Sequence, residues 1–259
     1  MVGSNYMEPL SLYKKAFTVE MRDVDFTGTL RLSSLFTYFQ EAANQHSEDL
    51  GIGFETIMEK FGVIWALIRI RVEILRYPVF NEEIVVETWP QEPKNLQFIR
   101  DFLARDQKGH IIARAVSIWA ILDAQTRKLQ RSKLIAANYP SSFKEERALE
   151  CKLGKLKPFG PLEMAYERFI GYSDIDFNEH LNNTKYVDLI MDCFSLESHK
   201  SHYVRSIEFN YVHEALPGDT IVLYKDLNAA DENLIYIEGI NEKEKKLAFQ
   251  SRIQIKERS

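Results

Sequence analysis

Apolar residues in this chain follow helical spacing in two stretches and strand-like alternation in much of the rest. From Leu32 to Leu50 they recur at i, i+3, i+4 and i+7, which predicts an amphipathic helix that Gly51 ends. The same spacing returns from Tyr186 to Phe194, and Asn182 and Asn183 before it are candidates for the helix N-cap. The pattern therefore predicts one helix in each half of the chain.

Strand-like runs follow each predicted helix and end at turn-forming residues. In the first half these runs cover 63–71, 83–89, 96–105 and 111–122. In the second half they cover 203–211, 220–227, 233–240 and 246–256. Alternation is clearest in 220–227 and 247–255, as is typical of antiparallel strands with one face in water. Each half is predicted to contain one strand, one long helix and then a meander of strands.

A short internal repeat relates the two halves. The segment Asp23-Val24-Asp25-Phe26 recurs as Asp174-Ile175-Asp176-Phe177, and at the same offset Leu30 falls on Leu181. One amphipathic helix against one sheet buries little apolar surface, whereas two such units side by side bury much more. We therefore predict an α+β protein of two tandem units, residues 1–139 and 162–259. Residues 140–161, rich in Ser, Lys, Glu, Gly and Pro, are predicted to form the linker.

The composition is that of a globular protein and narrows the classes of function. Of the 259 residues 45% are hydrophobic, and the formal net charge of −5 argues against nucleic acid as the main partner. Apolar runs such as 63–70 are too short to span a bilayer, so no stable membrane insertion is expected. The first residues do not resemble a signal peptide. Cys151 and Cys193 form neither a disulfide framework nor a metal-binding spacing, which favours a reducing cytoplasm.

The clearest candidate site is the polar segment before the second predicted helix. Asp176, Asn178 and His180 alternate, so in extended chain their side chains would share one face. The nearby helix start would favour a negative oxygen, and this combination suits polarising a carbonyl and activating water. A turn whose polar residues bond their own backbone is the structural alternative. The first copy of the repeat has Thr27 and Thr29 in place of the amide and imidazole, which favours chemistry in the second half.

Glu214 is a second candidate, because it lies at the end of a predicted strand before a Pro-Gly turn. An exposed turn glutamate is the structural alternative. His213 is interpreted as a strand-end neighbour and His46 as a packed histidine on the helix. The chain has no Gly-Xaa-Ser-Xaa-Gly elbow, no glycine-rich phosphate loop and no metal-ligand cluster, so no metal or cofactor is indicated.

These motifs resemble those of the acyl-ACP thioesterases of plants and bacteria, where ACP is acyl carrier protein. The resemblance runs from about Tyr13 to Ile255. It includes Asp-Xaa-Asn-Xaa-His-Xaa-Asn-Asn-Xaa-Xaa-Tyr at 176–186, the strand-end Glu214, and the first-half segments 35–44 and 76–89. It implies two tandem hotdog folds, each a long helix wrapped by an antiparallel sheet. It also implies hydrolysis of fatty acyl-ACP to free fatty acid and carrier, without a cofactor.

The resemblance carries catalytic roles to Asp176, Asn178, His180 and Glu214. Many plant members have cysteine after the glutamate, but this chain has Ala215, so the expected mechanism is water attack with Glu214 as general base. Asn178 is expected to position the water or the carbonyl. His180 and Asp176 are expected to form a hydrogen-bonded pair, and the oxyanion is expected near the N–H groups of 182–184.

The substrate contacts are predicted on the expectation that the first half binds the acyl chain and the second half cuts the thioester. The acyl chain is expected in the first half, against Phe39, Trp65 and Leu67, with Asn182 and Asn183 beside the thioester. Docking of the acidic carrier is expected to use basic residues after the first meander or in the linker: Arg127, Lys128, Arg131, Lys133, Lys152, Lys155 and Lys157. The alternatives are an acyl-CoA thioesterase, a non-catalytic acyl-binding or regulatory hotdog protein, and more remotely a dehydratase. Assembly into a homodimer is compatible with this prediction.

Overall fold

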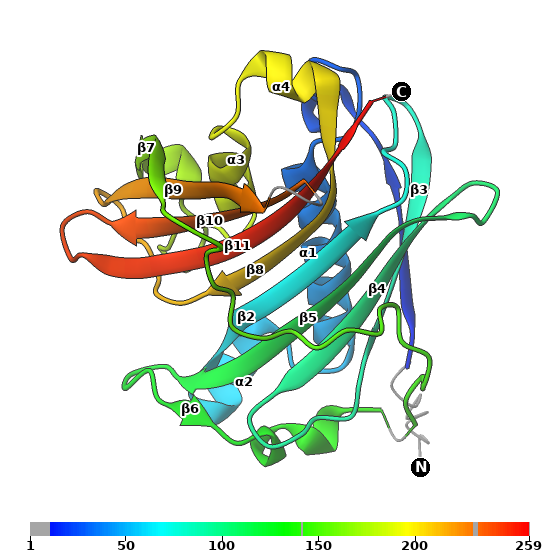
Figure 1. Ribbon diagram of the computed structural model, residues 1–259. Helices are drawn as coiled ribbons and strands as arrows, with labels where there is room; N and C mark the ends of the chain where they lie inside the picture. Colours follow the sequence, from blue (N-terminus) through cyan, green and yellow to red (C-terminus); the bar gives the residue numbers. More distant parts are fainter. Residues whose placement is uncertain (1–10, 141, 230–232, 259) are drawn as a thin grey trace, which may run out of the picture.

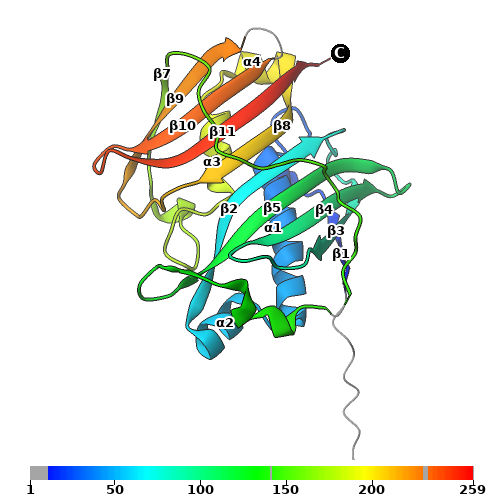
Figure 2. The same ribbon diagram turned by 60° about the horizontal axis from the view of Figure 1, so that its bottom comes forward.

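A single antiparallel sheet runs through the whole molecule in the computed structural model, which describes residues 11–140, 142–229 and 233–258 (Figure 1). Its strands lie in the order β1-β3-β4-β5-β2-β8-β11-β10-β9-β7, with the short β6 paired to β5. The first five strands come from the first half of the chain and the next five from the second, with β2 and β8 at the centre (Figure 2). The α+β class predicted from the sequence is confirmed.

The first half packs its sheet around one long helix. The elements in chain order are β1 (Tyr13–Thr18), α1 (Leu32–Asp49), α2 (Phe54–Phe61), β2 (Val63–Ile74), β3 (Glu83–Pro90), β4 (Phe98–Asp106), β5 (Ile111–Asp123) and β6 (Leu129–Gln130). The apolar stripe of α1 is buried against the sheet, as its spacing predicts. Short 3₁₀ turns at Met21–Asp23, Ser132–Leu134 and Ala136–Asn138 complete this half. The sequence did not predict α2, which Gly62 ends in the left-handed conformation at φ 63°.

The second half repeats this plan with a much shorter helix. Its elements are β7 (Glu163–Phe169), a 3₁₀ turn at Tyr172–Asp174, α3 (Lys185–Met191), α4 (Leu196–Ser201), β8 (His202–Tyr211), β9 (Thr220–Ala229), β10 (Leu234–Asn241) and β11 (Lys246–Glu257). The prediction of a long helix here is wrong, because α3 has 7 residues against 18 in α1. Ser195 interrupts the helical stretch: its side chain accepts from the Ser198 N–H and starts α4 as an N-cap.

The eight predicted meander strands all exist, and their ends agree with the prediction to within three residues. The two halves meet where β2 pairs antiparallel with β8, with Arg69–Glu73 opposite Ser206–Asn210. Val72 and Ile207 at this joint are buried in one core that both halves share. No helix among the described residues is long and apolar enough to cross a lipid bilayer.

Residues 142–161 of the predicted linker cross the face of the sheet that lies away from α1 (Figure 1). Trp89 Nε1 donates to the Glu146 carbonyl at 2.9 Å, and Asn210 Nδ2 donates to the Gly154 carbonyl at 2.9 Å. The buried Asp101 carboxylate accepts from Arg147 Nε at 2.8 Å. The predicted linker is therefore packed on both halves rather than hanging as a loose tether.

Candidate active site

The polar segment at 176–180 is a tight turn rather than extended chain. The Asp176 N–H donates to the His180 carbonyl at 2.9 Å, and the Glu179 N–H donates to the Asp176 carbonyl at 3.0 Å. The Asp176 side chain accepts from the Asn178 N–H at 2.9 Å. Ile175 and Leu181 pair as an isolated antiparallel bridge that closes the turn. The turn, and not strand alternation, sets the directions of the three polar side chains.

The first copy of the repeat has the same turn. Asp25 donates from its N–H to the Thr29 carbonyl at 3.0 Å and accepts from the Gly28 N–H at 3.0 Å. Its carboxylate accepts from the Thr27 N–H at 2.8 Å and from the Thr27 hydroxyl at 2.6 Å. The aspartate therefore forms the turn in both copies. The fourth residue of each five-residue turn also has positive φ, 74° at Gly28 and 63° at Glu179. What distinguishes the second copy is the amide and imidazole of Asn178 and His180.

His180 meets a carboxylate from one half and a guanidinium from the other. Its Nε2 lies 3.3 Å from Glu214 Oε2 and 3.4 Å from an Arg127 Nη atom. Arg127 also lies 3.4 Å from Glu214 Oε1, so the three side chains form a closed cluster. The His180 side chain is 18% exposed, whereas those of Glu214 and Arg127 are 48% and 42% exposed. Solvent therefore reaches the carboxylate, while the imidazole lies deeper.

The proton on Nε2 of His180 decides which of these contacts is a hydrogen bond. A protonated Nε2 donates to Glu214, and an unprotonated Nε2 accepts from Arg127. One ring nitrogen cannot do both at once, so the cluster can alternate between two states by moving one proton. Such a group can take a proton from a reacting water and return it to a leaving group.

One sequence-based expectation about this site is wrong, and a second stays a prediction. The Asp176 carboxylate makes no hydrogen bond to the His180 side chain among the described residues, because it accepts from the Asn178 N–H and holds the turn. Of the N–H groups expected to form an oxyanion site, Asn182 donates to the Asp174 carbonyl at 2.9 Å and Thr184 donates to Asn182 Oδ1 at 2.9 Å. The Asn183 N–H has no acceptor among the described residues, so an oxyanion site there stays a prediction. The Asn182 side chain thus supports the chain before α3, which begins only at Lys185.

The cluster opens onto a cavity of about 390 Å³ between the two halves. Its lining includes all four predicted catalytic residues, Asp176, Asn178, His180 and Glu214. Of the predicted substrate contacts, Trp65, Leu67 and Asn183 line it, but Phe39 and Asn182 do not. Phe39 is 1% exposed and packs in the core against Phe102, with ring centroids 5.1 Å apart.

Among the lining residues that sequence reasoning did not assign to the cavity, three bear on its shape and charge. Phe54 begins the unpredicted α2, Trp119 lies on β5, and Arg127 was assigned only to carrier docking. Arg127 sits with φ 57° in the turn after β5, where Asp123 Oδ1 accepts from the Thr126 N–H at 2.8 Å. Because β5 pairs with β2 along its whole length, this turn reaches the end of the sheet where Trp65 begins the cavity wall. No local sequence signal marks this contact.

Neither cysteine belongs to the cluster, so thiol chemistry is not expected to be needed. Burial raises the pKa of Cys193 to about 12, and its Sγ lies 3.4 Å from the Leu189 carbonyl, in the core. We expect Cys193→Ala and Cys151→Ser to retain turnover within about threefold of the parent, with iodoacetamide leaving turnover intact in the folded protein. Steady-state rates before and after alkylation measure this. Inactivation that tracks labelling of Cys193 in folded protein would contradict water attack.

A continuous sheet around two helices, with a carboxylate–imidazole–guanidinium cluster over a cavity between the halves, defines a tandem hotdog protein of the thiolester hydrolase class. Family models agree with both halves. The model of the acyl-ACP thioesterase N-terminal domain matches residues 11–136, and that of the C-terminal domain matches residues 165–258. The chain belongs to the acyl-ACP thioesterase family.

Individual relatives lie at moderate sequence distance. The chain is 28% identical over 250 residues to oleoyl-acyl carrier protein thioesterase 2 of Arabidopsis thaliana, covering 91% of this chain and 68% of the relative. It is 26% identical over 250 residues to dodecanoyl-[acyl-carrier-protein] hydrolase of Cinnamomum camphora, covering 89% of this chain and 65% of the relative. It therefore spans about two thirds of the length of these chloroplastic proteins.

Solved structures match this chain over a larger share of their own length than these relatives do. An acyl-ACP thioesterase of Bacteroides thetaiotaomicron superimposes with a TM-score of 0.86 at 27% identity, covering 95% of this chain and 98% of that one. The 12:0-ACP thioesterase of Umbellularia californica, at 21% identity and a TM-score of 0.80, shares the fold over 95% of this chain and 98% of that one.

Proposed function

We propose that this protein hydrolyses the thioester between a fatty acyl chain and acyl carrier protein, releasing free fatty acid and the carrier thiol. The observation that carries the proposal is the cluster of His180, Glu214 and Arg127 on the wall of a cavity that aromatic and aliphatic side chains of the first half also line. A cavity of a few hundred cubic ångströms suits an elongated small ligand. The family and its relatives support the same reaction.

In the proposed mechanism, water is the nucleophile. Glu214 accepts a proton from a water molecule, whose oxygen attacks the thioester carbonyl carbon to give a tetrahedral oxyanion. The C–S bond then breaks, and the leaving thiolate takes a proton to become the free thiol of the carrier arm. Glu214 suits the role of base because its carboxylate is half exposed, borders the cavity and touches two hydrogen-bond donors.

The neighbouring groups have distinct proposed roles. His180 Nε2–H stabilises the Glu214 carboxylate, gives its proton to the leaving sulfur and then takes over the proton that Glu214 removed from the water. Asn178 lines the cavity and orients the water or the carbonyl. Arg127 pairs with Oε1 of the Glu214 carboxylate, whereas His180 faces Oε2. Asp176 acts through the turn that it forms, so it is a positioning residue rather than a partner of the imidazole.

The acyl chain is proposed to run from this cluster into the first half. Trp65, Trp119 and Phe54 continue from the main cavity into a second, smaller one between α1 and the sheet. Each methylene buried against these aromatic rings contributes about 0.8 kcal/mol, so apolar contacts alone can hold a fatty chain along this part of the slot.

Thiol release tests the proposal directly. Purified protein is given acyl-ACP and acyl-CoA of equal chain length, and the released thiol is followed. We expect faster turnover of acyl-ACP. Preferential hydrolysis of acyl-CoA would reassign the enzyme to that class, and binding without any thiol release would support a non-catalytic acyl-binding protein.

The carrier is proposed to dock beside Arg127. Lys128, Arg131 and Lys133 are exposed on the segment that follows it, whereas Lys152 and Lys155 are exposed on the predicted linker. We expect Lys128→Glu with Lys133→Glu to raise KM for acyl-ACP about tenfold, an effect that salt weakens, and to change hydrolysis of a small acyl thioester little. Lys152→Glu with Lys155→Glu is the matched control. If both pairs of substitutions raise KM for acyl-ACP equally, the carrier does not dock at this surface.

A reducing cytoplasm remains the proposed location. Cys151 and Cys193 are free thiols, as expected there, although the plant relatives named above are chloroplastic. A homodimer also remains a prediction, which a sedimentation measurement would test.

A further inference from the structure

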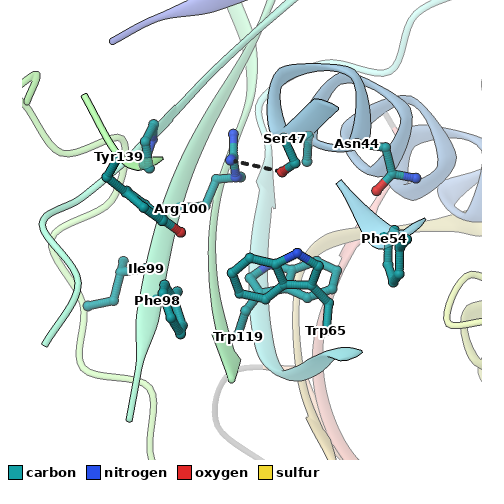
Figure 3. Close-up of a pocket in the computed structure, with 11 residues that line it drawn as sticks. Asn44, Ser47, Phe54, Trp65, Phe98, Ile99, Arg100, Trp119 and Tyr139 are labelled. Atoms are coloured by element: carbon teal, nitrogen blue, oxygen red, sulfur yellow. Dashed lines mark hydrogen bonds between the residues drawn. The ribbon is translucent and has the colours of Figure 1, made fainter. Parts of the chain in front are cut away.

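A small second cavity lies deep in the first half, next to the catalytic one. It measures about 30 Å³ and shares Phe54, Trp65 and Trp119 with the larger cavity. Figure 3 shows the two indole rings along one side of it and the side chains of Arg100 and Ser47 on the other. One wall is therefore apolar and the opposite wall carries a cation.

Arg100 is buried, and none of the residues that the structure describes supplies a counter-ion for it. The residue is 6% exposed, and within the described part of the chain no carboxylate lies within 4.0 Å of its guanidinium. Its hydrogen-bond contacts are His46 Nδ1 at 3.0 Å, the Thr88 hydroxyl at 3.4 Å and the Ser47 hydroxyl at 3.4 Å. Burial lowers the pKa of Arg100 to about 10, which still leaves it charged at neutral pH. A guanidinium has five N–H donors, so these neutral and partly long contacts leave donor capacity unused.

Two more polar side chains border the same space. Asn44 and Tyr139 line the cavity, and neither side chain makes a hydrogen bond to any residue that the structure describes. Such groups near a buried cation form a site that an oxygen acceptor would complete. The volume is enough for one or two water molecules or for a single small oxygen-bearing group.

We propose that this cavity, lined by Arg100, Ser47, Asn44 and Tyr139, binds an oxygen substituent at the far end of the acyl chain, so that the preferred substrates carry a distal hydroxyl or carbonyl. The inference rests on the proposed function and on the acyl chain running past Trp65. The oxygen of a hydroxyl group accepts from the guanidinium, and its O–H donates to the Asn44 amide oxygen. A plain methyl end of equal length displaces water from the cation and offers nothing in return.

The test compares acyl-ACP substrates in matched pairs. Each pair has one saturated chain and the same chain with a hydroxyl on its last carbon, over a series of lengths. In the parent enzyme we expect one hydroxylated chain to exceed its saturated partner in kcat/KM by about tenfold. Arg100→Met and Tyr139→Phe should each lower that ratio severalfold or more while hydrolysis of saturated chains continues. Tyr172→Phe, at a residue that is 99% exposed, is the matched control.

Arg100→Met has a risk of misfolding because the side chain is buried, so circular dichroism accompanies each variant. If that variant is unfolded, Tyr139→Phe and Asn44→Leu decide the question, since neither removes a hydrogen bond to a described residue. The inference is overturned if the saturated chain is preferred at every length, or if the ratio is the same in the parent and in every folded variant.

Binding of free fatty acids separates this inference from the proposed function. Calorimetry with a saturated acid and its hydroxylated counterpart needs no turnover. If no acyl-ACP is hydrolysed but the hydroxylated acid binds about tenfold more tightly in an Arg100-dependent way, the hydrolase proposal fails and the binding site stands. If hydrolysis is rapid but both acids bind equally, the hydrolase stands and the distal oxygen site is rejected.

Discussion

Replacing Glu214 with glutamine is expected to lower kcat for acyl-ACP by a factor of about 10² to 10⁴, the usual contribution of a positioned general base. The amide keeps the shape of the side chain but accepts protons poorly, and it also loses the ionic contact with Arg127 at 3.4 Å. Because Glu214 is 48% exposed, the change should leave the fold intact. Single-turnover rates with acyl-ACP, compared with KM from steady state, separate chemistry from binding.

His180→Gln is expected to reduce kcat to a similar extent, since its Nε2 is the donor that faces Glu214. If the two groups act on one proton, the double variant should be little slower than the slower single variant. Glu179→Gln, in the same turn but exposed and outside the cavity lining, is the matched control and should keep the parent rate. A folded Glu214→Gln enzyme with the parent kcat would remove the carboxylate from the mechanism.

The elements of this fold were predictable because their patterns are local. Alternation and helical spacing fix which face of each segment is apolar, and those faces are buried as predicted in α1 and in the meander strands. The short helix α3 shows the limit of the pattern. Tyr186, Val187 and Ile190 are buried as expected. The helix nevertheless ends at Met191, before Phe194, and Ser195 starts the separate helix α4 by accepting from the Ser198 N–H. A cap of this kind competes with helical spacing, and spacing alone does not show which prevails.

The site was predictable in its second-half residues and not in its first-half partner. Asn178 and His180 stand out because the repeat supplies an internal comparison with Thr27 and Thr29. Arg127 comes from a turn in the other half of the chain, and sequence spacing says nothing about contacts across the joint between the halves. The interpretation of Asp176 failed for a different reason. Its carboxylate bonds the Asn178 N–H in a turn, whereas the expectation assumed extended chain.

Because the acyl chain is proposed to lie against Trp65, substitutions at this residue are expected to change the preferred chain length strongly. Trp65 lines both cavities and packs edge-on against Phe98 and Trp119, with ring centroids 4.8 Å and 6.4 Å apart. Its indole therefore narrows the proposed slot where the two cavities meet. We expect Trp65→Leu to admit about two more methylenes, which at about 0.8 kcal/mol each changes the ratio of kcat/KM between longer and shorter chains by roughly tenfold or more. Leu67→Phe places a larger side chain in the cavity wall, so it should favour shorter acyl chains.

Phe39→Leu is the matched control for this shift in chain length. It also replaces an aromatic ring by leucine, but Phe39 packs against Phe102 in the core and does not line the catalytic cavity. It should lower the melting temperature without moving the length profile. Trp65→Leu also loses the bond from Nε1 to the Ile52 carbonyl at 2.9 Å, so its profile is read from ratios of kcat/KM rather than from absolute rates. If Trp65→Leu and Leu67→Phe leave the profile unchanged, while substitutions along 186–194 shift it, the acyl chain lies in the second half.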